Sequence, residues 1–298
     1  PEEHHVMHAK WIQEEMPVRL AHRLMDFFEL PFVVICNARF HEVFRLFLHA
    51  FETLVETPPV KDSKDVEAFA GVLRQLVRGH DHTIHMLQEG YGELQTLLDG
   101  LIELDDFLNQ TCFTRIGNRV LAEHFLEVHE ARSSSPARDS CGVVDPHVCP
   151  ADIVRELASS LGGLCDELFG HQIEVVLDGE LGTTVAFVPE HLHFVLQEIL
   201  KNAMRATLER HFRDKQLPPV TVSVLKGTFD VTLKISDRGG GMPREQLLNV
   251  WRYGYTSAKQ RSPLKQKDDF DTLCGRDPAS MRRLAGYGFG LPLSRVYA

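Results

Sequence analysis

Residues 192–208 form the stretch that most restricts how this chain can fold. Glu198, Asn202 and Arg205 stand at i, i+4 and i+7, so a helix here presents a carboxylate, an amide and a guanidinium on one face. The apolar residues recur at steps of three, four or five, the spacing of a half-buried helix, and are Leu192, Val195, Leu196, Ile199, Leu200, Ala203 and Leu208. An amide oxygen one turn from a carboxylate suits Mg²⁺, which takes oxygen ligands and keeps several waters. A merely solvated helix face would show the same pattern.

Two glycine-rich segments follow this predicted helix. Residues 236–242 read Ser-Asp-Arg-Gly-Gly-Gly-Met after an apolar strand, and residues 286–291 read Gly-Tyr-Gly-Phe-Gly-Leu. Each is a weak signal alone, because short glycine motifs recur by chance and serve several folds. The order of a helix with acid and amide, a strand ending in Asp-x-Gly-x-Gly, and a Gly-x-Gly-x-Gly-Leu segment is far more specific.

This order resembles the ATP-binding fold shared by gyrases, Hsp90, bacterial histidine kinases and MutL. Longer strings at 200–207, 235–241 and 290–295 narrow the resemblance to the mitochondrial 2-oxoacid dehydrogenase kinases. The resemblance implies a protein-serine kinase that uses ATP and Mg²⁺ in the mitochondrial matrix. Such a kinase phosphorylates and inactivates the E1α subunit of a 2-oxoacid dehydrogenase complex. Residues 16–23 and 114–119 resemble the branched-chain kinase more closely, so the branched-chain complex is the first predicted substrate and pyruvate dehydrogenase the second.

Three other protein classes would fit part of the sequence. A two-component histidine kinase would carry acid-labile phosphohistidine on its own chain, but four predicted bundle helices disfavour it. An ATPase like Hsp90 or MutL would hydrolyse ATP without labelling a protein, and it leaves an N-terminal bundle unexplained. A pseudokinase that only binds the complex conflicts with the presence of Glu198, Asn202, Asp237 and the motif glycines.

The resemblance assigns roles to the helix with the polar face. Glu198 is the predicted catalytic base, which takes the proton of the attacking serine hydroxyl, and Asn202 is the predicted Mg²⁺ ligand. Lys201 either assists Glu198 or only pairs with it on the surface, and Arg205 is expected on the nucleotide side. These four residues are therefore predicted ATP-site residues.

The glycine-rich segments are expected to hold the two ends of ATP. Asp237 can accept a hydrogen bond from the adenine amino group, while Gly239 and Gly241 would let the backbone approach the base without a Cβ clash. A simple turn after a strand would also account for this Asp-x-Gly-x-Gly sequence. Backbone N–H groups of the second segment, at the start of a helix, would form an anion site for the triphosphate. The residues assigned to this second site are Gly286, Tyr287, Gly288, Phe289, Gly290 and Leu291.

The segment between the two glycine-rich motifs carries further predictions that rest on the resemblance. The hydroxyls of Thr256 and Ser257 are expected to bind phosphate oxygens, and the basic stretch 258–285 is expected to form a mobile lid. A K⁺ ion is predicted on the backbone carbonyls of Val250, Arg252 and Tyr255.

The chain reads as an α+β protein of two domains. Residues 1–135 are predicted to form a four-helix bundle, and residues 151–298 an α/β sandwich that binds ATP, with helices on one face of a mostly antiparallel sheet. Residues 136–150, rich in Ser, Pro and Gly, are the predicted linker. The third bundle helix is expected over 65–101 with an irregularity at 90–92, and strands are expected at 172–177, 184–188, 220–224 and 229–236.

The resemblance adds expectations about partners and chain ends. The bundle would dock the lipoyl domain of the E2 core and bind small-molecule inhibitors, and the protein would form a homodimer. Family members continue with further strands and a tail, so the C-terminal end is expected to be truncated at residue 298. The family usually has a histidine where this chain has Phe125, and the neighbouring His124 is the candidate substitute.

Composition argues against several other classes. The net charge of −10 disfavours general binding to nucleic acids. The sequence contains no run of 18 apolar residues, so no membrane-spanning helix is predicted. The six cysteines form no Cys-x-x-Cys pair, so neither a zinc motif nor a redox motif is indicated, and free thiols are expected.

Overall fold

The chain folds into two units. The computed structural model describes residues 2–98, 103–133, 142–255 and 288–298. The first unit spans Pro1–Asp145 and the second Pro146–Ala298, so the boundary falls inside the segment that the sequence predicts as a linker. None of the described helices is both long and apolar enough to cross a membrane.

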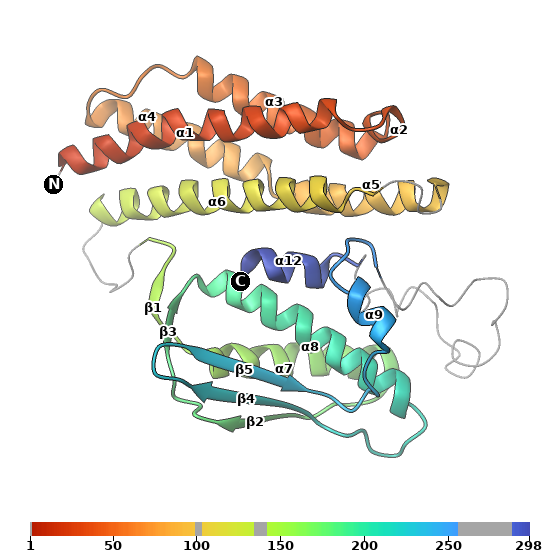
Figure 1. Cartoon of the computed structure of the whole chain (residues 1–298). Helices are drawn as coiled ribbons and strands as arrows, with labels where there is room; N and C mark the ends of the chain where they lie inside the picture. The colour runs from red at the N-terminus through yellow and green to blue at the C-terminus, as the bar shows by residue number, and fades with distance from the viewer. Residues whose placement is uncertain (1, 99–102, 134–141, 256–287) are drawn as a thin grey trace. The chain divides into compact units, whose positions relative to one another are not determined.

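The first unit is helical throughout its described residues up to residue 133 (Figure 1). Its helices are α1 (Glu2–Phe28), α2 (Phe32–Ile35), α3 (Ala38–Glu56), α4 (Ser63–Gly79), α5 (Thr83–Leu98) and α6 (Asp105–Ser133). Each long helix buries an apolar stripe. In α3 the stripe holds Phe40, Phe47 and Leu54, which face α1 and α5 across the bundle. The predicted helical N-terminal region is therefore confirmed.

The prediction of one long third helix over 65–101 is wrong. The structure divides it into α4 and α5 at residues 80–82, not at the expected 90–92. A contact from α6 supports this break, because Nη2 of Arg115 donates a hydrogen bond to the carbonyl oxygen of His80 at 3.1 Å. Because α4 has ended there, that carbonyl has no partner within the helix, and it also accepts the N–H of Thr83 at 3.2 Å.

Gly90 lies inside α5 and serves close packing. A Cβ at this position would lie 2.9 Å from Cβ of Arg39 and 2.9 Å from the ring of Phe40, both at the start of α3. The two helices can therefore approach here only because residue 90 has no side chain. Gly92 has no such neighbour within 4 Å.

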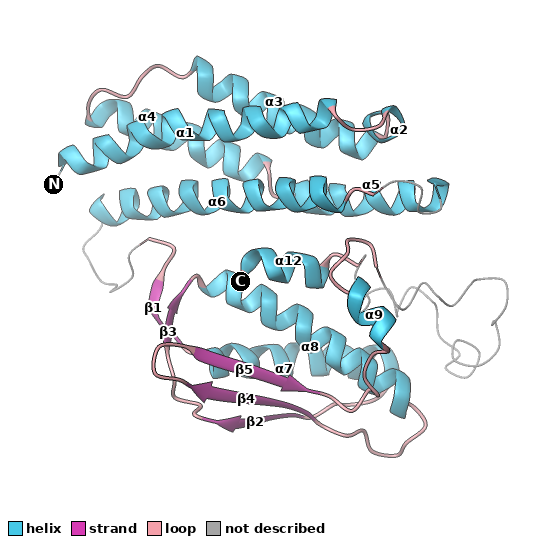
Figure 2. Ribbon diagram, viewed as in Figure 1, coloured by secondary structure: helices cyan, strands magenta, loops and turns pink. Residues whose placement is uncertain are grey.

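The second unit packs helices on one face of a mixed sheet (Figure 2). β4 pairs in parallel with β2 and antiparallel with β5, so the predicted hairpin is confirmed and the expected mostly antiparallel sheet is corrected to a mixed one. The two long helices are α7 (Pro150–Phe169) and α8 (Pro189–His211), followed by α9 (Arg244–Asn249) and α12 (Gly290–Tyr297). The strands are β2 (Val175–Gly179), β4 (Val220–Lys226) and β5 (Val231–Ser236).

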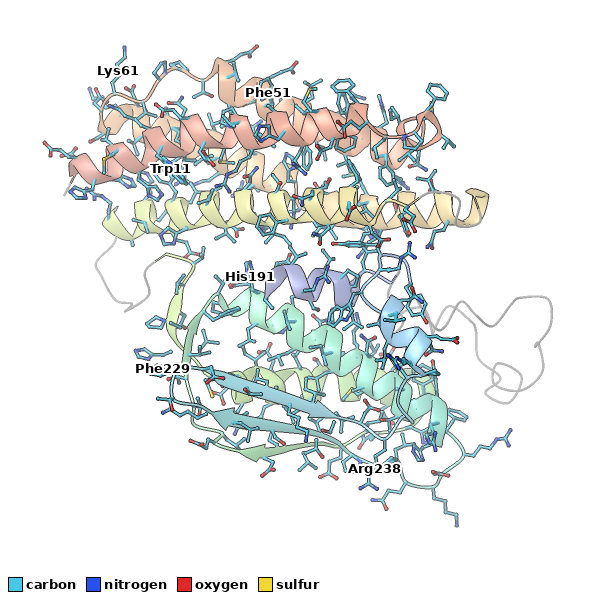
Figure 3. The ribbon with its side chains drawn as sticks, viewed as in Figure 1. Trp11, Phe51, Lys61, His191, Phe229 and Arg238 are labelled. Carbon is cyan, nitrogen blue, oxygen red and sulfur yellow. The ribbon has the colours of Figure 1, made fainter. Side chains whose placement is uncertain are left out.

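A smaller pair of strands lies beside this sheet. β1 (Asp145–Val148) pairs with β3 (Val185–Phe187), although the sequence predicts only a linker at β1. The described cysteines Cys36, Cys112, Cys149 and Cys165 are free thiols, as expected. Figure 3 shows the side chains on the ribbon. Phe229, in the turn between β4 and β5, points away from the sheet and is 99% exposed.

Candidate functional site

One cavity of the second unit collects many of the described residues predicted to bind ATP. Its volume is about 390 Å³, within the range of small-molecule sites. Its lining includes Glu198, Asn202 and Arg205 from α8, and Gly239, Gly241, Gly288, Gly290 and Leu291 from the two glycine-rich segments. Val250 and Tyr255 complete the predicted residues that the lining contains. The structure thus brings together segments that lie up to 93 positions apart, from residue 198 to residue 291.

α8 presents its polar face to this cavity because its other face is buried. Leu196, Leu200 and Met204 pack into a core shared with α7 and the sheet. Burial of one stripe fixes the rotation of the helix, which turns the residues at i, i+4 and i+7 toward the cavity. The face predicted from the sequence therefore exists in the folded chain.

The carboxylate of Glu198 is held between a lysine and the first residue of α12. Nζ of Lys201 lies 2.5 Å from Oε1, and the side chains of Lys201 and Glu198 are only 15% and 13% exposed. A Cβ on Gly290 would lie 2.1 Å from Oε2, so the carboxylate occupies the space that a side chain at 290 would need. Lys201 was expected either to assist Glu198 or only to pair with it on the surface. The low exposure of both side chains does not match a solvated surface pair.

The first glycine-rich segment packs on α8. The N–H of Gly239 donates to Oδ1 of Asp237 at 2.7 Å, and Asp237 itself is exposed and lies outside the cavity lining. A Cβ on Gly239 would lie 2.4 Å from Cβ of Ala206, so this glycine permits contact between loop and helix. Gly241 has φ +72°, and a Cβ added there would meet nothing within 4 Å, so the backbone conformation and not the lack of space favours glycine at this position. The adenine-binding role of Asp237 stays a prediction.

The second glycine-rich segment begins, in its described part, at Gly288. This residue has φ +76°, and its carbonyl oxygen accepts the N–H of Gly254 at 3.0 Å. Phe289, a predicted ATP-binding residue, is fully buried, with its ring 4.9 Å from that of Tyr253, and it does not line the cavity. Gly288 and Gly290, the first residue of α12, line the cavity with their backbone.

Several predicted residues lie outside the described part of the chain. They are Thr256, Ser257, Gly286, Tyr287 and the expected lid at 258–285. The predicted K⁺ site also stays a prediction. The carbonyl oxygen of Arg252 accepts the N–H of Tyr255 at 3.3 Å, and Arg252 does not line the cavity.

The sequence reasoning missed six residues of the lining: Ala206, Glu209, Arg210, Met242, Gln246 and Pro292. Two of them could have been predicted from helical spacing. Ala206 lies one turn after Asn202, and Glu209 lies one turn after Arg205, so both share the face of α8 that carries the predicted residues. Arg205 and Glu209 are themselves an ion pair with N and O 3.7 Å apart.

The lining fits a magnesium nucleotide. It offers the carboxylate of Glu198, the amide of Asn202 and the guanidinium groups of Arg205 and Arg210. The described residues contain no group of three or more His, Cys, Asp or Glu side chains suited to a metal ion. A metal held here would therefore take most of its ligands from phosphate and water, as Mg²⁺ usually does in nucleotide sites.

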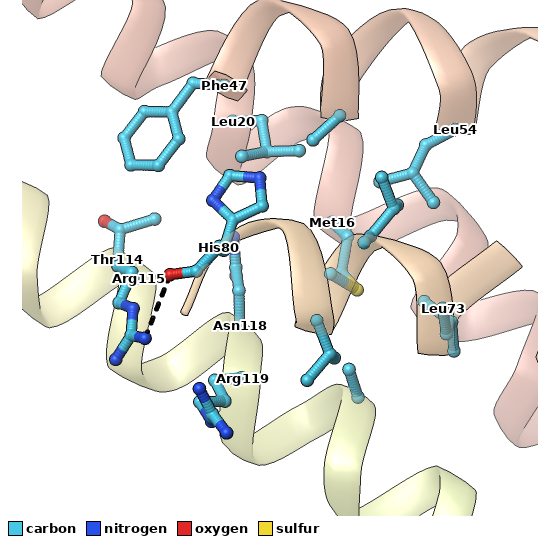
Figure 4. A pocket seen from close by; sticks show the side chains of 14 residues that line it. Met16, Leu20, Phe47, Leu54, Leu73, His80, Thr114, Arg115, Asn118 and Arg119 are labelled. Atoms are coloured by element: carbon cyan, nitrogen blue, oxygen red, sulfur yellow. Dashed lines mark hydrogen bonds between the residues drawn. The ribbon is translucent and has the colours of Figure 1, made fainter. Parts of the chain in front are cut away.

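The helical unit contains a second, smaller cavity of about 50 Å³ (Figure 4). Apolar side chains such as Leu20 and Phe47 form most of its wall, and its polar residues are His80, Thr114, Arg115, Asn118 and Arg119. Burial above all, and then the nearby Arg115, lower the pKa of His80 to about 4, so the imidazole is neutral near pH 7. Oδ1 of Asn118 is buried with no hydrogen-bond partner among the described residues.

Phe125 stands where the family usually has a histidine, and His124 precedes it on α6. Phe125 is fully buried and stacks on His5 with ring centroids 5.0 Å apart. His124 lies beside His8, at 6.2 Å between ring centroids. Phe125 is thus a packing residue in this chain.

Comparison with known proteins gives matches to both units. Residues 1–145 match the family described as mitochondrial branched-chain alpha-ketoacid dehydrogenase kinase, and residues 187–298 match the histidine kinase-, DNA gyrase B- and HSP90-like ATPases. Over 97% of its length the chain is 31% identical to a mitochondrial pyruvate dehydrogenase (acetyl-transferring) kinase of Arabidopsis thaliana, and covers 77% of it. Over 97% of its length it is also 30% identical to the kinase of that name in Ascaris suum and 29% identical to human isozyme 4, covering 71% and 70% of them.

Proposed function

The chain belongs to the mitochondrial 2-oxoacid dehydrogenase kinases, and from this premise we propose that it phosphorylates a serine of the E1α subunit of the pyruvate dehydrogenase complex. It is an ATP-dependent protein kinase, and the mitochondrial location expected from the resemblance agrees with its relatives. The choice of pyruvate dehydrogenase as substrate rests on one observation: the chain is 31% identical to a pyruvate dehydrogenase kinase over 97% of its length. The three relatives named above are all pyruvate dehydrogenase kinases, so the branched-chain complex, first in the sequence prediction, becomes the second candidate.

In the proposed reaction, Glu198 acts as the base. Its carboxylate takes the proton of the substrate serine while the serine oxygen bonds to the γ-phosphorus and the bond between that phosphorus and ADP breaks. Lys201 holds Oε1 of the carboxylate at 2.5 Å, which leaves Oε2 beside Gly290 in the cavity wall. A base whose Oε1 is fixed by Lys201 needs little reorientation to react, and this supports the assignment.

The remaining polar residues of the cavity are assigned to the nucleotide. Mg²⁺, when bound, neutralises phosphate charge during transfer. Asn202 would hold it through the side-chain oxygen, one helical turn from Glu198. Arg205 lies on the same face and would attract the phosphates, and the backbone at Gly288–Leu291 would donate N–H groups to them at the start of α12. Asp237 remains the proposed partner of the adenine amino group.

An apolar patch on the helical unit is the proposed dock for the lipoyl domain. It lies where α1 ends and α2 begins and consists of Met25, Phe28, Phe32 and Val33. Phe28 is 68% exposed and Phe32 80% exposed, which is unusual for rings of this size. A lipoyl arm is a long apolar chain, so a patch of this kind suits it. The homodimer rests on the family resemblance alone.

The cavity of about 50 Å³ inside the bundle is the proposed site for a small regulatory molecule. Arg115 and Arg119 lie in its wall together with the unpartnered oxygen of Asn118, so a small anion that can also donate a hydrogen bond would suit it. Binding of such a molecule should raise the melting temperature, and Asn118→Leu should abolish that rise.

The proposal is tested by phosphate transfer to two substrates in parallel. The protein is incubated with radiolabelled ATP, Mg²⁺ and purified E1 of the pyruvate or the branched-chain complex, each with its E2 core. We expect acid-stable label on E1α serine, faster with pyruvate E1. Faster labelling of branched-chain E1 would reverse the order of the two candidates. ATP hydrolysis without label on either E1 would overturn the kinase proposal.

A further inference from the structure

The backbone that follows α9 contacts the first described residues of the second glycine-rich segment. The N–H of Gly254 donates to the carbonyl oxygen of Gly288 at 3.0 Å. A Cβ on Gly288 would lie 2.6 Å from the carbonyl carbon of Gly254 and 2.7 Å from the carbonyl oxygen of Tyr255. Tyr255 and Gly288 both line the cavity assigned to ATP, so this close backbone contact forms part of its wall.

An aromatic pair lies behind this part of the wall. The rings of Tyr253 and Phe289 meet edge to face, with centroids 4.9 Å apart and planes at 68°. Both side chains are buried, and rings in this geometry attract each other beyond the effect of burial alone. Neither residue lines the cavity, but Phe289 stands between two residues that do, Gly288 and Gly290. The pair can therefore affect the cavity only through the backbone.

Phe289 connects the pair to the first turn of α12. Its carbonyl oxygen accepts the N–H of the buried Leu293 at 2.9 Å. Oγ of Ser294, which is also buried, donates to the carbonyl oxygen of Gly290 at 2.8 Å. The N–H groups of Gly290 and Leu291 begin the helix and have no partner within it. The position of Phe289 therefore decides where these two N–H groups point.

A second side-chain contact joins the same two segments at the surface. The guanidinium carbon of Arg295, on α12, lies 5.8 Å from the ring centroid of Trp251, within the range of a cation–π interaction. Trp251 is 45% exposed, and such interactions are weak where water reaches them. We therefore expect the buried pair of Tyr253 and Phe289 to hold the two segments together more firmly than this surface contact.

We propose that Tyr253 and Phe289 are positioning residues for the phosphates of ATP. Their ring contact, together with the hydrogen bond from Gly254 to Gly288, holds the backbone at 288–291 in the conformation that donates N–H groups to phosphate oxygens. The inference rests on the proposed ATP site. Loss of either ring lets this backbone adopt other conformations, which must then be given up when ATP binds. Phosphate binding is weakened, and contacts to the base and the ribose are spared.

The test measures the Kd of Mg-ATP and of adenosine, which has no phosphate, by isothermal titration calorimetry. Tyr253→Leu and Phe289→Leu should each bind Mg-ATP about 10- to 100-fold more weakly than the wild type, the loss expected for one hydrogen bond to a charged group. Adenosine should bind to both variants within about twofold of the wild type, since independent contacts contribute additively. Tyr253→Phe keeps the ring and should bind Mg-ATP as the wild type does.

A double variant distinguishes a shared contact from general damage. Because the two rings act through one contact, the protein with both Tyr253→Leu and Phe289→Leu should bind Mg-ATP at most about twofold more weakly than the weaker single variant. This comparison decides if adenosine binds too weakly to be measured. Phe169→Leu is the matched control, because it truncates a buried ring of the α7 core that does not line the cavity, and it should leave the Kd of Mg-ATP unchanged.

Wild-type affinity in both single variants, equal losses for Mg-ATP and adenosine, or losses that multiply in the double variant would overturn the inference and leave the proposed function intact. If the leucine variants do not fold, by circular dichroism, Gly254→Ala decides. Its φ of +69° disfavours alanine and so strains the backbone contact with Gly288. Mg-ATP should bind more weakly to this variant, and unchanged affinity would refute the inference. No binding of Mg-ATP by the wild type would overturn the proposed function and the inference with it.

Discussion

Replacement of Gly290 by alanine should damage catalysis without damaging the fold. The new Cβ would lie 2.1 Å from Oε2 of Glu198, whereas real Cβ contacts essentially never fall below 3.0 Å. The carboxylate must therefore move by about 1 Å. It can do so, since it is the far end of a flexible side chain. A misplacement of about 1 Å can cost about 100-fold in rate, so we expect kcat to fall by about that factor in Gly290→Ala.

The folded state should absorb the same change easily. Alanine is a better helix former than glycine by up to about 1 kcal/mol, so the melting temperature should hold or rise. Gly163→Ala in α7 is the matched control, because its new Cβ meets nothing within 4 Å. It should also hold or raise the melting temperature, and it should leave kcat unchanged.

Two measurements check this reasoning: initial rates of E1α phosphorylation at saturating ATP, and thermal unfolding followed by circular dichroism. A kcat of Gly290→Ala within about threefold of the wild type would refute the claim that the carboxylate position matters. A parallel fall of kcat and melting temperature would show that the variant fails through unfolding, which would also contradict the reasoning.

Three further predictions concern other residues. Gly90→Ala should lower the free energy of unfolding by about 1–3 kcal/mol in urea titrations, because its Cβ would meet α3 at 2.9 Å, whereas Gly92→Ala should be neutral or stabilising; equal effects would contradict the packing account. Burial lowers the pKa of His80 from 6.5 to about 4, so the unfolded state binds the proton more readily and stability should fall as pH drops through that window, by at most about 3 kcal/mol. His80→Gln should flatten this dependence in urea midpoints, and an unchanged slope would count against it. Lys201→Met should lower kcat by about tenfold or more by freeing Glu198, with partial rescue by arginine, and an unchanged rate would remove the lysine from the mechanism.

Local spacing was enough to predict the central helix and its functional face. The apolar stripe of α8 sets its rotation, and the three polar residues at i, i+4 and i+7 follow from that rotation. The hairpin of β4 and β5 was predictable for the same kind of reason, since Gly227 lies in the turn and donates its N–H to the carbonyl of Asp230 at 2.8 Å. In both cases the information lies within a few residues of the element.

The features that the sequence did not predict depend on residues far away. The break between α4 and α5 is supported by Arg115, which lies 35 positions beyond His80. The parallel pairing of β2 with β4 joins strands separated by the whole of α8. Gly239 lines the cavity as predicted, and its packing on α8, where a Cβ would lie 2.4 Å from Cβ of Ala206, was not predictable from the sequence. Phe289 stands inside a glycine motif, but its ring packs against Tyr253. Such contacts become visible only when the folded chain brings the partners together.

The most direct test of the central claim is single-turnover transfer from radiolabelled ATP to pyruvate dehydrogenase E1α by the wild type and by Glu198→Gln, a variant of nearly the same size. The account predicts rapid, acid-stable serine labelling by the wild type. It predicts near-complete loss of labelling in the variant, with ATP still bound at similar affinity. Transfer by Glu198→Gln at a rate close to that of the wild type, or acid-labile label on the kinase chain itself, would contradict it.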